Sequence, residues 1–488
     1  MGTRAAIVAL AGGLGIAGAA PPAHAGGARS DALGAKVLAA VRAAHFDRVV
    51  DFAGGGARGI AHVPNVDVAV IELDDAGRAR AAANVLLSRD YPRGQLAPID
   101  QSWGTSAVRF LRWQQARFDG PRGWTTRPSL RPAEDIVPGR GRARYRFMSP
   151  YPASLFKIMV AYEVLRQVDR GRIGLGDSLG YAGVPASALC GPGRATVRAW
   201  LDAMITFSSN QATCALLTRL HRLDAVGALN ADLAGLGLRT LQVTGTRASN
   251  GANWQDGKLN MTALDTARLF WLIDGGEGTL WQRPDGRPVT AAELSPSSRA
   301  LLKGLLGDDA FADTLSTTVW CGLRRFGRSY PAPGIPQVEP ARWMDARGHV
   351  VVPGDNGDFG FDVRPCNAAA QVTFQHKIGL VDTAASDAGI VRSLPGRPGR
   401  HYAIAMLSNL GSRYADPGWA RGRNPCSTPL GLCRTEKFAV LGRLIDQALT
   451  GAVTARRPEA PAVTAAPVPG PAVPPAGWRP PRPQDGRP

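Results

Sequence analysis

The 488-residue chain contains little lysine and no long apolar run after its first 25 residues. Only 6 of its 57 basic residues are lysine, and the 51 arginines are spread along the chain. The net charge of +18 therefore indicates a bias of composition rather than a nucleic-acid site. A membrane-spanning helix needs about 18 consecutive apolar residues, so the sequence excludes a protein with several membrane spans. With 44% hydrophobic residues, most of the chain can bury a core.

Motifs for metal and thiol chemistry are missing as well. The chain has no C-x-x-C and no H-E-x-x-H, and its seven histidines lie far apart in the sequence. These absences argue against a zinc ribbon, a thioredoxin-like site and a zinc peptidase. We therefore expect no metal and no organic cofactor. No internal repeat is visible, and the sequence does not indicate an oligomeric state.

The first 25 residues have the pattern of a secretory signal peptide. Arg4 is followed by an apolar stretch and by Ala23-His-Ala25, after which we expect cleavage and export to the bacterial envelope or beyond. No stable membrane span is expected after cleavage. Six cysteines, an even number, suit an oxidising compartment. The sequence does not choose among the possible pairings, but spacing favours Cys190–Cys214, Cys321–Cys366 and a local Cys426–Cys433 link.

Periodicity divides the remaining chain into two parts and a tail. Residues 26–150 hold a helix (31–50), a strand (66–73) and an irregular stretch. Residues 151–450 form the main domain, with a helical subdomain at about 160–275 and an uninterpreted insertion at about 280–370. Its expected elements are helices at 154–169, 196–205, 211–222, 262–274 and 434–450, and strands at 371–381 and 401–410. Residues 451–488 are rich in proline and predicted to be disordered. This order predicts a sheet built from both chain ends with helices inserted between.

Three short motifs carry candidate chemistry, and each occurs once. They are Ser154-Leu-Phe-Lys157 at the start of a long helix, Ser208-Ser-Asn210 between two helices, and Lys377-Ile-Gly379 in a strand. Residues three apart on a helix share a face, so Lys157 can reach the Ser154 hydroxyl. A lysine acts as a base only when burial or a second cation lowers its pKa, and Lys377 can be that cation. Ser208 can relay a proton, and Asn210 can orient Lys157 or bind a substrate amide.

Each motif also has a purely structural interpretation. A serine before a helix is usually a cap, and Lys157 and Lys377 can be ordinary surface residues. The scarcity of lysine weakens this interpretation, because two of the six lysines fall at motif positions. Both also lie in apolar surroundings, with Ile-Met-Val-Ala after Lys157 and Ile378 after Lys377. We therefore interpret the three motifs as one functional site.

Together the motifs resemble those of the active-site-serine penicillin-recognising enzymes, most closely the class A β-lactamases and related serine hydrolases. The resemblance covers about 150–275 and 370–450. It implies an α/β sandwich, with a five-stranded antiparallel sheet, flanking helices and an all-helical subdomain. By this resemblance Ser154 is the nucleophile, Lys157 the acylation base or part of its relay, and Ser208 the proton donor to the leaving nitrogen. It places Asn210 at the acyl amide, Lys377 and Gly379 beside the substrate carboxylate, and the oxyanion between the N–H groups of Ser154 and Leu380.

Two departures from the family pattern concern the substrate and the second half of the reaction. The middle residue of the lysine motif is normally a hydroxyl that contacts the substrate carboxylate, and here it is Ile378. The family's loop glutamate, which activates water for deacylation, is absent, since residues 211–276 contain no glutamate. Asp256-Gly-Lys-Leu-Asn260 keeps the spacing with a shorter acid. Asp256 is therefore a possible deacylation base, and an ordinary loop acid is the alternative.

Other functions compete with β-lactam hydrolysis. D-alanyl peptide hydrolysis, as in a carboxypeptidase, or cleavage of another amide or ester uses the same acyl-enzyme step, so a β-lactam or a cell-wall peptide is the expected partner. A catalytically impaired cell-wall-binding protein is a further alternative. Gly176-Asp-Ser178-Leu-Gly180 matches a lipase pattern, but no strand is expected before Ser178 and no D-x-x-H occurs. We interpret Ser178 as a loop residue.

Overall fold

The computed structural model describes residues 27–52, 58–115, 118, 132–185, 187–325, 328–352, 357–415 and 431–450. The expected signal peptide, the proline-rich tail and Cys426 lie outside the described residues. Among the helices of the described ranges, none combines the length and the hydropathy needed to cross a membrane.

The central sheet is antiparallel and is built from both ends of the chain, as the sequence predicts. Its order is β18-β19-β20-β3-β4-β5. The strands are β3 (Val66–Leu73), β4 (Ala79–Leu87), β5 (Gln95–Leu96), β18 (Val372–Val381), β19 (Ala384–Ser393) and β20 (His401–Ser408). The sheet thus has six strands instead of the expected five, because the two-residue β5 pairs with the edge of β4. The motif strand β18 lies at the opposite edge and pairs along its whole length with β19.

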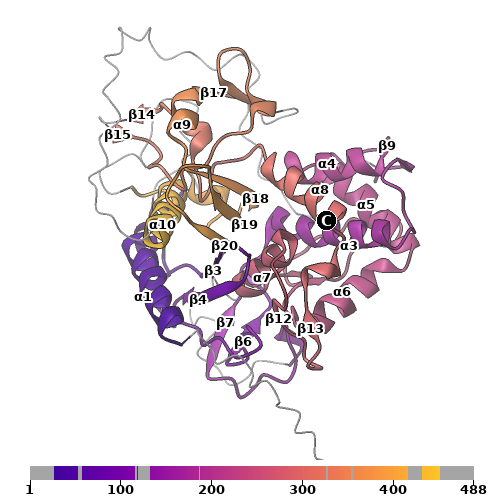
Figure 1. The fold of residues 1–488 in the computed structure, drawn as a ribbon, viewed down its shortest axis with the longest axis horizontal. Helices are drawn as coiled ribbons and strands as arrows, with labels where there is room; N and C mark the ends of the chain where they lie inside the picture. The colour runs from indigo at the N-terminus through magenta and orange to yellow at the C-terminus, as the bar shows by residue number, and fades with distance from the viewer. Residues whose placement is uncertain are drawn as a thin grey trace, which may run out of the picture.

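Helices cover both faces of this sheet (Figure 1). On one face, α1 (Gly27–Ala43) and α10 (Arg434–Leu449) pack together over β4 and its neighbours. On the other face, α7 (Ala263–Asp274) contacts β3, β19 and β20. Strands covered on both faces bury nearly every side chain, and β20 is buried from end to end.

The helical half of the molecule lies beside the sheet (Figure 1). It contains α3 (Lys157–Asp169), α4 (Val197–Thr206), α5 (Asn210–Arg222), α6 (Ala225–Gly235) and α8 (Pro296–Gly307). The last of these comes from the segment that the sequence left uninterpreted. Since α8 contacts α3, α4 and the sheet strand β18, it joins the two halves next to the three motifs.

The rest of that segment forms a small unit on the β18 side of the sheet (Figure 1). It contains β16 (His349–Val352), β17 (Gly357–Asp362) and α9 (Arg364–Ala369), around a core that includes Trp343. The disulfide Cys321–Cys366 links its ends, and Cys190–Cys214 forms in the helical half, so both of these pairings are confirmed. Cys433 is also disulfide-bonded.

Short strands and 3₁₀ turns complete the described chain. The strands are β1 (Val50–Asp51), β2 (Arg58–Gly59), β6 (Val108–Leu111), β7 (Tyr145–Met148), β8 (Ser178–Tyr181), β9 (Gly193–Thr196), β10 (Gln242–Val243), β11 (Leu259–Asn260), β12 (Trp281–Gln282), β13 (Pro288–Val289), β14 (Arg324–Arg325) and β15 (Arg328–Ser329). The turns are η1 (Phe46–Arg48), η3 (Pro132–Glu134), η4 (Ala153–Phe156), η5 (Ala291–Glu293), η6 (Thr318–Trp320), η7 (Ala341–Trp343) and η8 (Ser412–Tyr414).

Candidate active site

Ser154 lies in the 3₁₀ turn η4, directly before helix α3. It is the one residue between Tyr151 and Val160 that is not buried. The preceding residue, Ala153, has φ 48°, in the left-handed region that an alanine rarely adopts. Strained backbone of this kind persists only where the surrounding structure holds it, and it is common at active sites. The turn therefore presents the Ser154 hydroxyl toward solvent from a fixed position.

Lys157, the first residue of α3, is fully buried. Its Nζ donates to the Ser208 carbonyl oxygen at 2.6 Å, to Ser208 Oγ at 3.2 Å and to Asn210 Oδ1 at 2.7 Å. The structure thus brings three of the predicted site residues into direct contact. All three acceptor oxygens are neutral, so no carboxylate in the described residues is hydrogen-bonded to this ammonium group.

The break between α4 and α5 supplies these acceptors. Ser208 has φ 61°, a second strained position within the motifs. Its neighbour Ser209 caps α5 by accepting from Ala212 N at 3.1 Å, and Ser209 N donates to Ala203 O at 2.9 Å. These bonds hold the turn rigidly, so that Asn210 starts α5 with its amide oxygen on Lys157.

The electrostatic surroundings favour the neutral form of Lys157. Burial and the nearby Lys377 ammonium group hold the pKa of Lys157 well below its usual range, while Asp309 opposes this shift. A lysine whose pKa is lowered in this way can accept a proton from a hydroxyl near neutral pH. The charge of Lys377 thus adds to the effect of burial on Lys157.

The edge strand β18 carries the third motif against η4. Lys377 is fully buried, Ile378 is 6% exposed and Leu380 is partly exposed. A side chain at Gly379 would lie 2.7 Å from Leu155 N and closer still to the Pro152 carbonyl oxygen. Only glycine permits this close approach of strand and turn. Ser386 on β19 completes the contact by donating its hydroxyl to Pro152 O at 2.7 Å.

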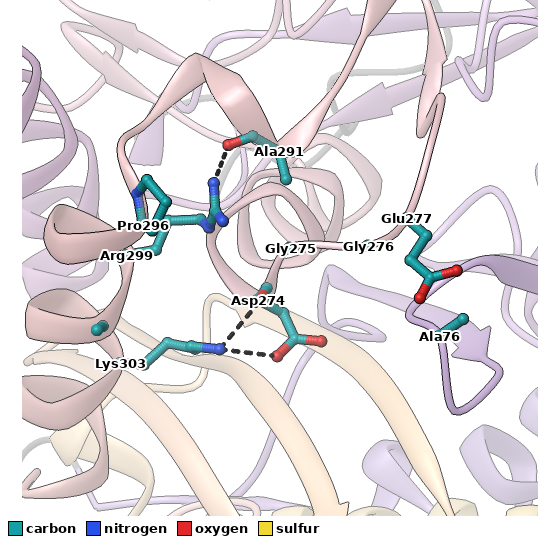
Figure 2. Close-up of a pocket in the computed structure, with 10 residues that line it drawn as sticks. Ala76, Asp274, Gly275, Gly276, Glu277, Ala291, Pro296, Arg299 and Lys303 are labelled. Atoms are coloured by element: carbon teal, nitrogen blue, oxygen red, sulfur yellow. Dashed lines mark hydrogen bonds and ion pairs between the residues drawn. The ribbon is translucent and has the colours of Figure 1, made fainter.

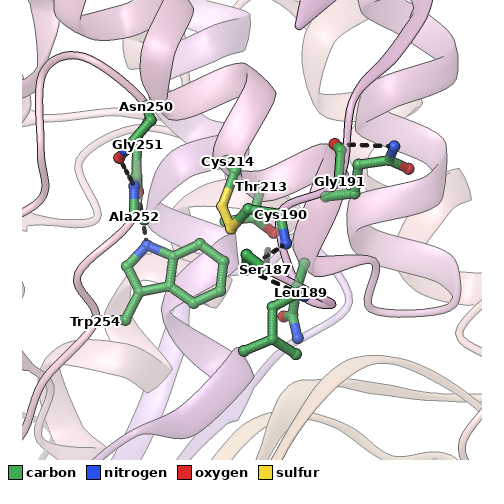
Figure 3. The surroundings of a disulfide bond; sticks show 12 residues. Ser187, Leu189, Cys190, Gly191, Thr213, Cys214, Asn250, Gly251, Ala252 and Trp254 are labelled. Carbon is green, nitrogen blue, oxygen red and sulfur yellow. Dashed lines mark hydrogen bonds between the residues drawn. A yellow bond between two sulfur atoms is a disulfide. The ribbon is translucent and has the colours of Figure 1, made fainter. Parts of the chain in front are cut away.

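The disulfide Cys190–Cys214 supports the helical side of the site (Figure 3). Cys214 lies one turn into α5, and the adjoining loop places Trp254 with its Nε1 donating to Gly251 O at 2.8 Å. The Trp254 ring packs against Phe156, with ring centroids 5.3 Å apart. Phe156 is the residue before Lys157, so this contact reaches the base of the site.

Asp256, the candidate deacylation residue, forms no hydrogen bond with the other motif residues in the described part of the chain. It is exposed, and its carboxylate accepts no hydrogen bond from the described residues. Loss of surrounding water still raises its pKa to about 6. Its charge acts on Tyr151, three residues before Ser154. Asn260, which ends the same pattern, donates to Gln242 Oε1 and to Gly257 O within its own loop.

Asp309, which the sequence analysis did not identify, contacts Lys377 and also affects the pKa of Lys157 through its charge. It follows α8, is fully buried, and has Oδ2 3.3 Å from Lys377 Nζ. A second buried pair adjoins it, in which His376 Nδ1 lies 2.8 Å from Asp387 Oδ1 on β19. The adjacent Asp308-Asp309 in the sequence gave no indication of a partner, because the pairing depends on how α8 meets β18.

Other candidate features lie apart from this site. A cavity of about 310 Å³ is lined by Asp274, Glu277, Arg299 and Lys303, none of which belongs to a motif (Figure 2). Two of its charges pair with each other, since Lys303 Nζ lies 3.6 Å from Asp274 Oδ1, and Arg299 Nη1 donates to Leu294 O at 2.7 Å. Ser178 begins strand β8 and is not followed by a helix, so it lacks the geometry of a nucleophile elbow.

One group of described residues brings metal-ligating atoms close together. Asp345, His349 and Asp358 do so in the unit around β16 and β17. Arg347 Nη2 lies 2.7 Å from both carboxylates, so an arginine already supplies the positive charge there.

Comparison with known proteins was made on sequence and on structure. Residues 148–294 match the model of the "Beta-lactamase enzyme family". This segment contains the motifs with Ser154 and Ser208 and ends before Lys377. No curated protein matches the chain.

Several solved structures are similar to this chain at low identity. A mutant of PBP-A, in an acyl-enzyme complex with penicillin G, is 15% identical with a TM-score of 0.41, over 85% of this chain and 95% of that one. A β-lactamase from Sphaerobacter thermophilus is 16% identical with a TM-score of 0.40, over 86% and 97%. A β-lactamase from Chitinophaga pinensis is 18% identical with a TM-score of 0.34, over 60% and 83%.

Proposed function

Because the chain has a serine β-lactamase-like, penicillin-recognising fold, we propose that it is a serine hydrolase that forms an acyl-enzyme on Ser154. The observation that carries this proposal is the environment of Lys157. A fully buried lysine that contacts only neutral oxygens is costly to keep charged. Such a residue is suited to taking a proton from a neighbouring hydroxyl.

In the first step the Ser154 oxygen attacks the acyl carbon of an amide or ester. Lys157 takes the serine proton, and Ser208, in contact with Lys157 Nζ, passes a proton to the leaving nitrogen or oxygen. Asn210 binds the acyl amide. The backbone N–H groups of Ser154 and Leu380 stabilise the oxyanion, and the position of Leu380 on an edge strand supports this assignment.

In the second step water releases the acyl group and restores Ser154. Asp256 is the candidate base for this water, and its pKa of about 6 leaves it mostly ionised at neutral pH. Its exposure and unheld carboxylate favour slow deacylation. β-Lactam amide hydrolysis is the reaction that the family resemblance favours, and a D-alanyl peptidase or esterase shares the first step.

We also propose that the protein works outside the cytoplasm. The signal-peptide pattern of residues 1–25 supports export. The described disulfides support it as well, since such bonds persist in oxidising compartments.

Intact-mass measurement of adducts tests the acyl-enzyme. The mature chain and Ser154→Ala would be treated with an alkyl fluorophosphonate, which labels activated serines, and with a penicillin. We expect one fluorophosphonate adduct on the parent and none on Ser154→Ala, with equal thermal unfolding of both proteins. The lifetime of any penicillin adduct then separates a working β-lactamase from a slowly deacylating enzyme. Equal labelling of parent and variant contradicts the proposal.

A further inference from the structure

The lysine of the third motif is not available as a free positive charge. Lys377 and Asp309 are both fully buried, and their Nζ and Oδ2 atoms lie 3.3 Å apart. Burial raises the pKa of the Asp309 carboxyl, and the Lys377 ammonium group opposes this rise. In the described residues this carboxylate is the only hydrogen-bond acceptor of Lys377 Nζ. The charge that could attract an anionic substrate is therefore neutralised inside the protein.

Asp309 is held firmly in this position by its neighbours in sequence. Its Oδ1 accepts from Phe311 N at 2.9 Å. Ala310 N donates to Thr206 O at 2.8 Å, which ties the segment to the end of α4. On the other side, Trp343 Nε1 donates to Asp308 O at 2.7 Å. The backbone on both sides of Asp309 is therefore anchored, and its carboxylate is held by the bond from Phe311 N.

Ile378, the residue after Lys377, supplies no group that could bind a substrate carboxylate in place of the lysine. Ile378 stands where a hydroxyl would contact a carboxylate, and it has no donor. Its partner in register on β19 is Asp387, a fully buried acid that binds His376 and accepts from Leu315 N at 3.0 Å. The group beside Ile378 is thus an acid rather than an arginine or lysine.

Further carboxyl groups lie around the same pair. Asp387 raises the pKa of Asp309, and Asp309 in turn raises the pKa of Asp313 and of Glu339. Glu339 is buried, and neither of its carboxyl oxygens has a hydrogen-bond partner in the described residues. A substrate carboxylate placed here would lose its water without gaining an unpaired cation, which is unfavourable.

We infer that, among the donors that could acylate Ser154, the site favours neutral amides or esters over penicillins and D-alanyl peptides, because the leaving nitrogen of both of these is next to a carboxylate. This inference rests on the proposed acyl-enzyme at Ser154. In the step concerned, the Ser154 oxygen bonds to the acyl carbon and the bond from that carbon to the leaving oxygen or nitrogen breaks. The serine proton ends on the leaving group, and water later converts the acyl-enzyme to the free acid.

A matched pair of esters tests the selection. Both donors carry the same N-acylglycyl group, and the leaving group is either 2-hydroxypropanoate or 2-hydroxypropanamide. They differ only in a carboxylate against a carboxamide. Values of kcat/KM would be divided by the rate of hydroxide hydrolysis of each ester, which removes their intrinsic reactivity. We expect the corrected value for the carboxamide donor to be at least about tenfold higher.

Variants of Ile378 and Asp309 then show which residue causes the selection between the two donors. Ile378→Thr adds the hydroxyl, and Asp309→Asn frees the lysine charge. Each change, and more so the double variant, is expected to shift the ratio toward the carboxylate donor. Val351→Thr, at an exposed position of β16 in the small unit beside β18, is the matched control and leaves the ratio unchanged.

The results separate the two proposals. If the parent treats both donors alike or favours the carboxylate, while Ser154 is still labelled by the fluorophosphonate, the selection is wrong and the acyl-enzyme stands. If neither donor nor fluorophosphonate modifies Ser154, both proposals fail. Should Asp309→Asn not fold, the parent ratio and Ile378→Thr alone decide the question.

Discussion

The two lysines of the site are alike in burial and differ in what they touch. Lys157 contacts a carbonyl, a hydroxyl and an amide oxygen, all neutral, whereas Lys377 contacts the carboxylate of Asp309. Burial without a carboxylate lowers the pKa of Lys157. Lys377, by contrast, forms a buried ion pair with Asp309. Within the described residues only Lys157 of the two is hydrogen-bonded to neutral oxygens alone, and this environment suits it to act as a base.

The partners of the two lysines also come from different parts of the chain. Those of Lys157 lie in the short break between α4 and α5, whose sequence is itself a motif. Asp309 comes from the segment after α8, held against α4 through Ala310. The helical side of the site is thus built locally, and the sheet side depends on the long segment inserted before β18.

Replacing Lys157 by methionine removes the proposed base and keeps Lys377 with its carboxylate partner. We expect Lys157→Met to slow acylation of Ser154 by roughly 10²–10⁴-fold, because the general base is lost. Folding should survive, since methionine fills the same buried space without a charge. The rate of fluorophosphonate adduct formation, followed by intact mass, measures the effect. Lys36→Met, at an exposed position on α1, is the matched control. A loss of less than tenfold would show that Lys157 is not the base.

The pH dependence of acylation should show how Lys377 affects the pKa of Lys157. Lys377 lowers the pKa of Lys157 and Asp309 raises it. The base works when Lys157 is neutral, so the rate rises as pH passes through this pKa. Lys377→Met should raise the pKa of Lys157 and move the acid limb of the profile to higher pH. Asp309→Asn should move the limb to lower pH. Shifts in the same direction would contradict the assigned electrostatics.

The free energy of unfolding should depend on pH because of the buried acids near Lys377. Burial raises the pKa of Glu339 to about 8, so the folded protein holds a proton there that the unfolded chain releases near its usual pKa of 4.5. The folded state binds more protons in this window, so the free energy of unfolding falls as pH rises from about 4.5 to 8, by up to about 1.4 kcal/mol per pH unit.

Glu339→Gln tests this slope. Urea unfolding would be measured at pH 5, 7 and 9. The unfolding free energy of the variant should not fall with rising pH, and the variant should be more stable than the parent at pH 9. Glu277→Gln, at an exposed position, should keep the slope of the parent. Parallel profiles of parent and Glu339→Gln would mean that Glu339 is not protonated in the folded state.

The sequence predicted elements whose pattern is strong and missed those that depend on pairing. Strand β3 was predicted with its observed bounds, because Val66–Leu73 is rich in β-branched residues. Strands β4 and β19 were not recognised, since β4 is rich in alanine and the first part of β19 combines alanine with serine, aspartate and glycine, all weak strand formers. Their conformation is imposed by neighbours on either side in the sheet. The two-residue β5 gives no sequence signal at all.

The residues of the candidate site differ in the same way in how well the sequence predicted them. Ser154, Lys157, Ser208 and Asn210 were proposed as site residues because each lies in a short motif that can be recognised in the sequence, although Lys157 meets Ser208 and Asn210 across 51 and 53 positions. Asp309 was missed because it lies in no such motif, and its contact with Lys377 across 68 positions leaves no local pattern. Helix α8 was missed too, although Ser295 caps it and Pro296 stands at its first position.

Asp256 extends the comparison to the second half of the reaction, where we expect the smallest effect. Lys157 is held by three hydrogen bonds, whereas the Asp256 carboxylate accepts none from the described residues. An unheld carboxylate does not fix a water molecule in a productive position. Asp256→Asn should therefore change the lifetime of a penicillin or ester adduct by less than about threefold and leave acylation unchanged, since an effective general base contributes 10²-fold or more. Adduct decay at pH 5 and pH 8 provides the measurement, because its pKa of about 6 lies between them. If decay slows a hundredfold in the variant, and in the parent follows an ionisation near pH 6, the loop acid is the deacylation base after all.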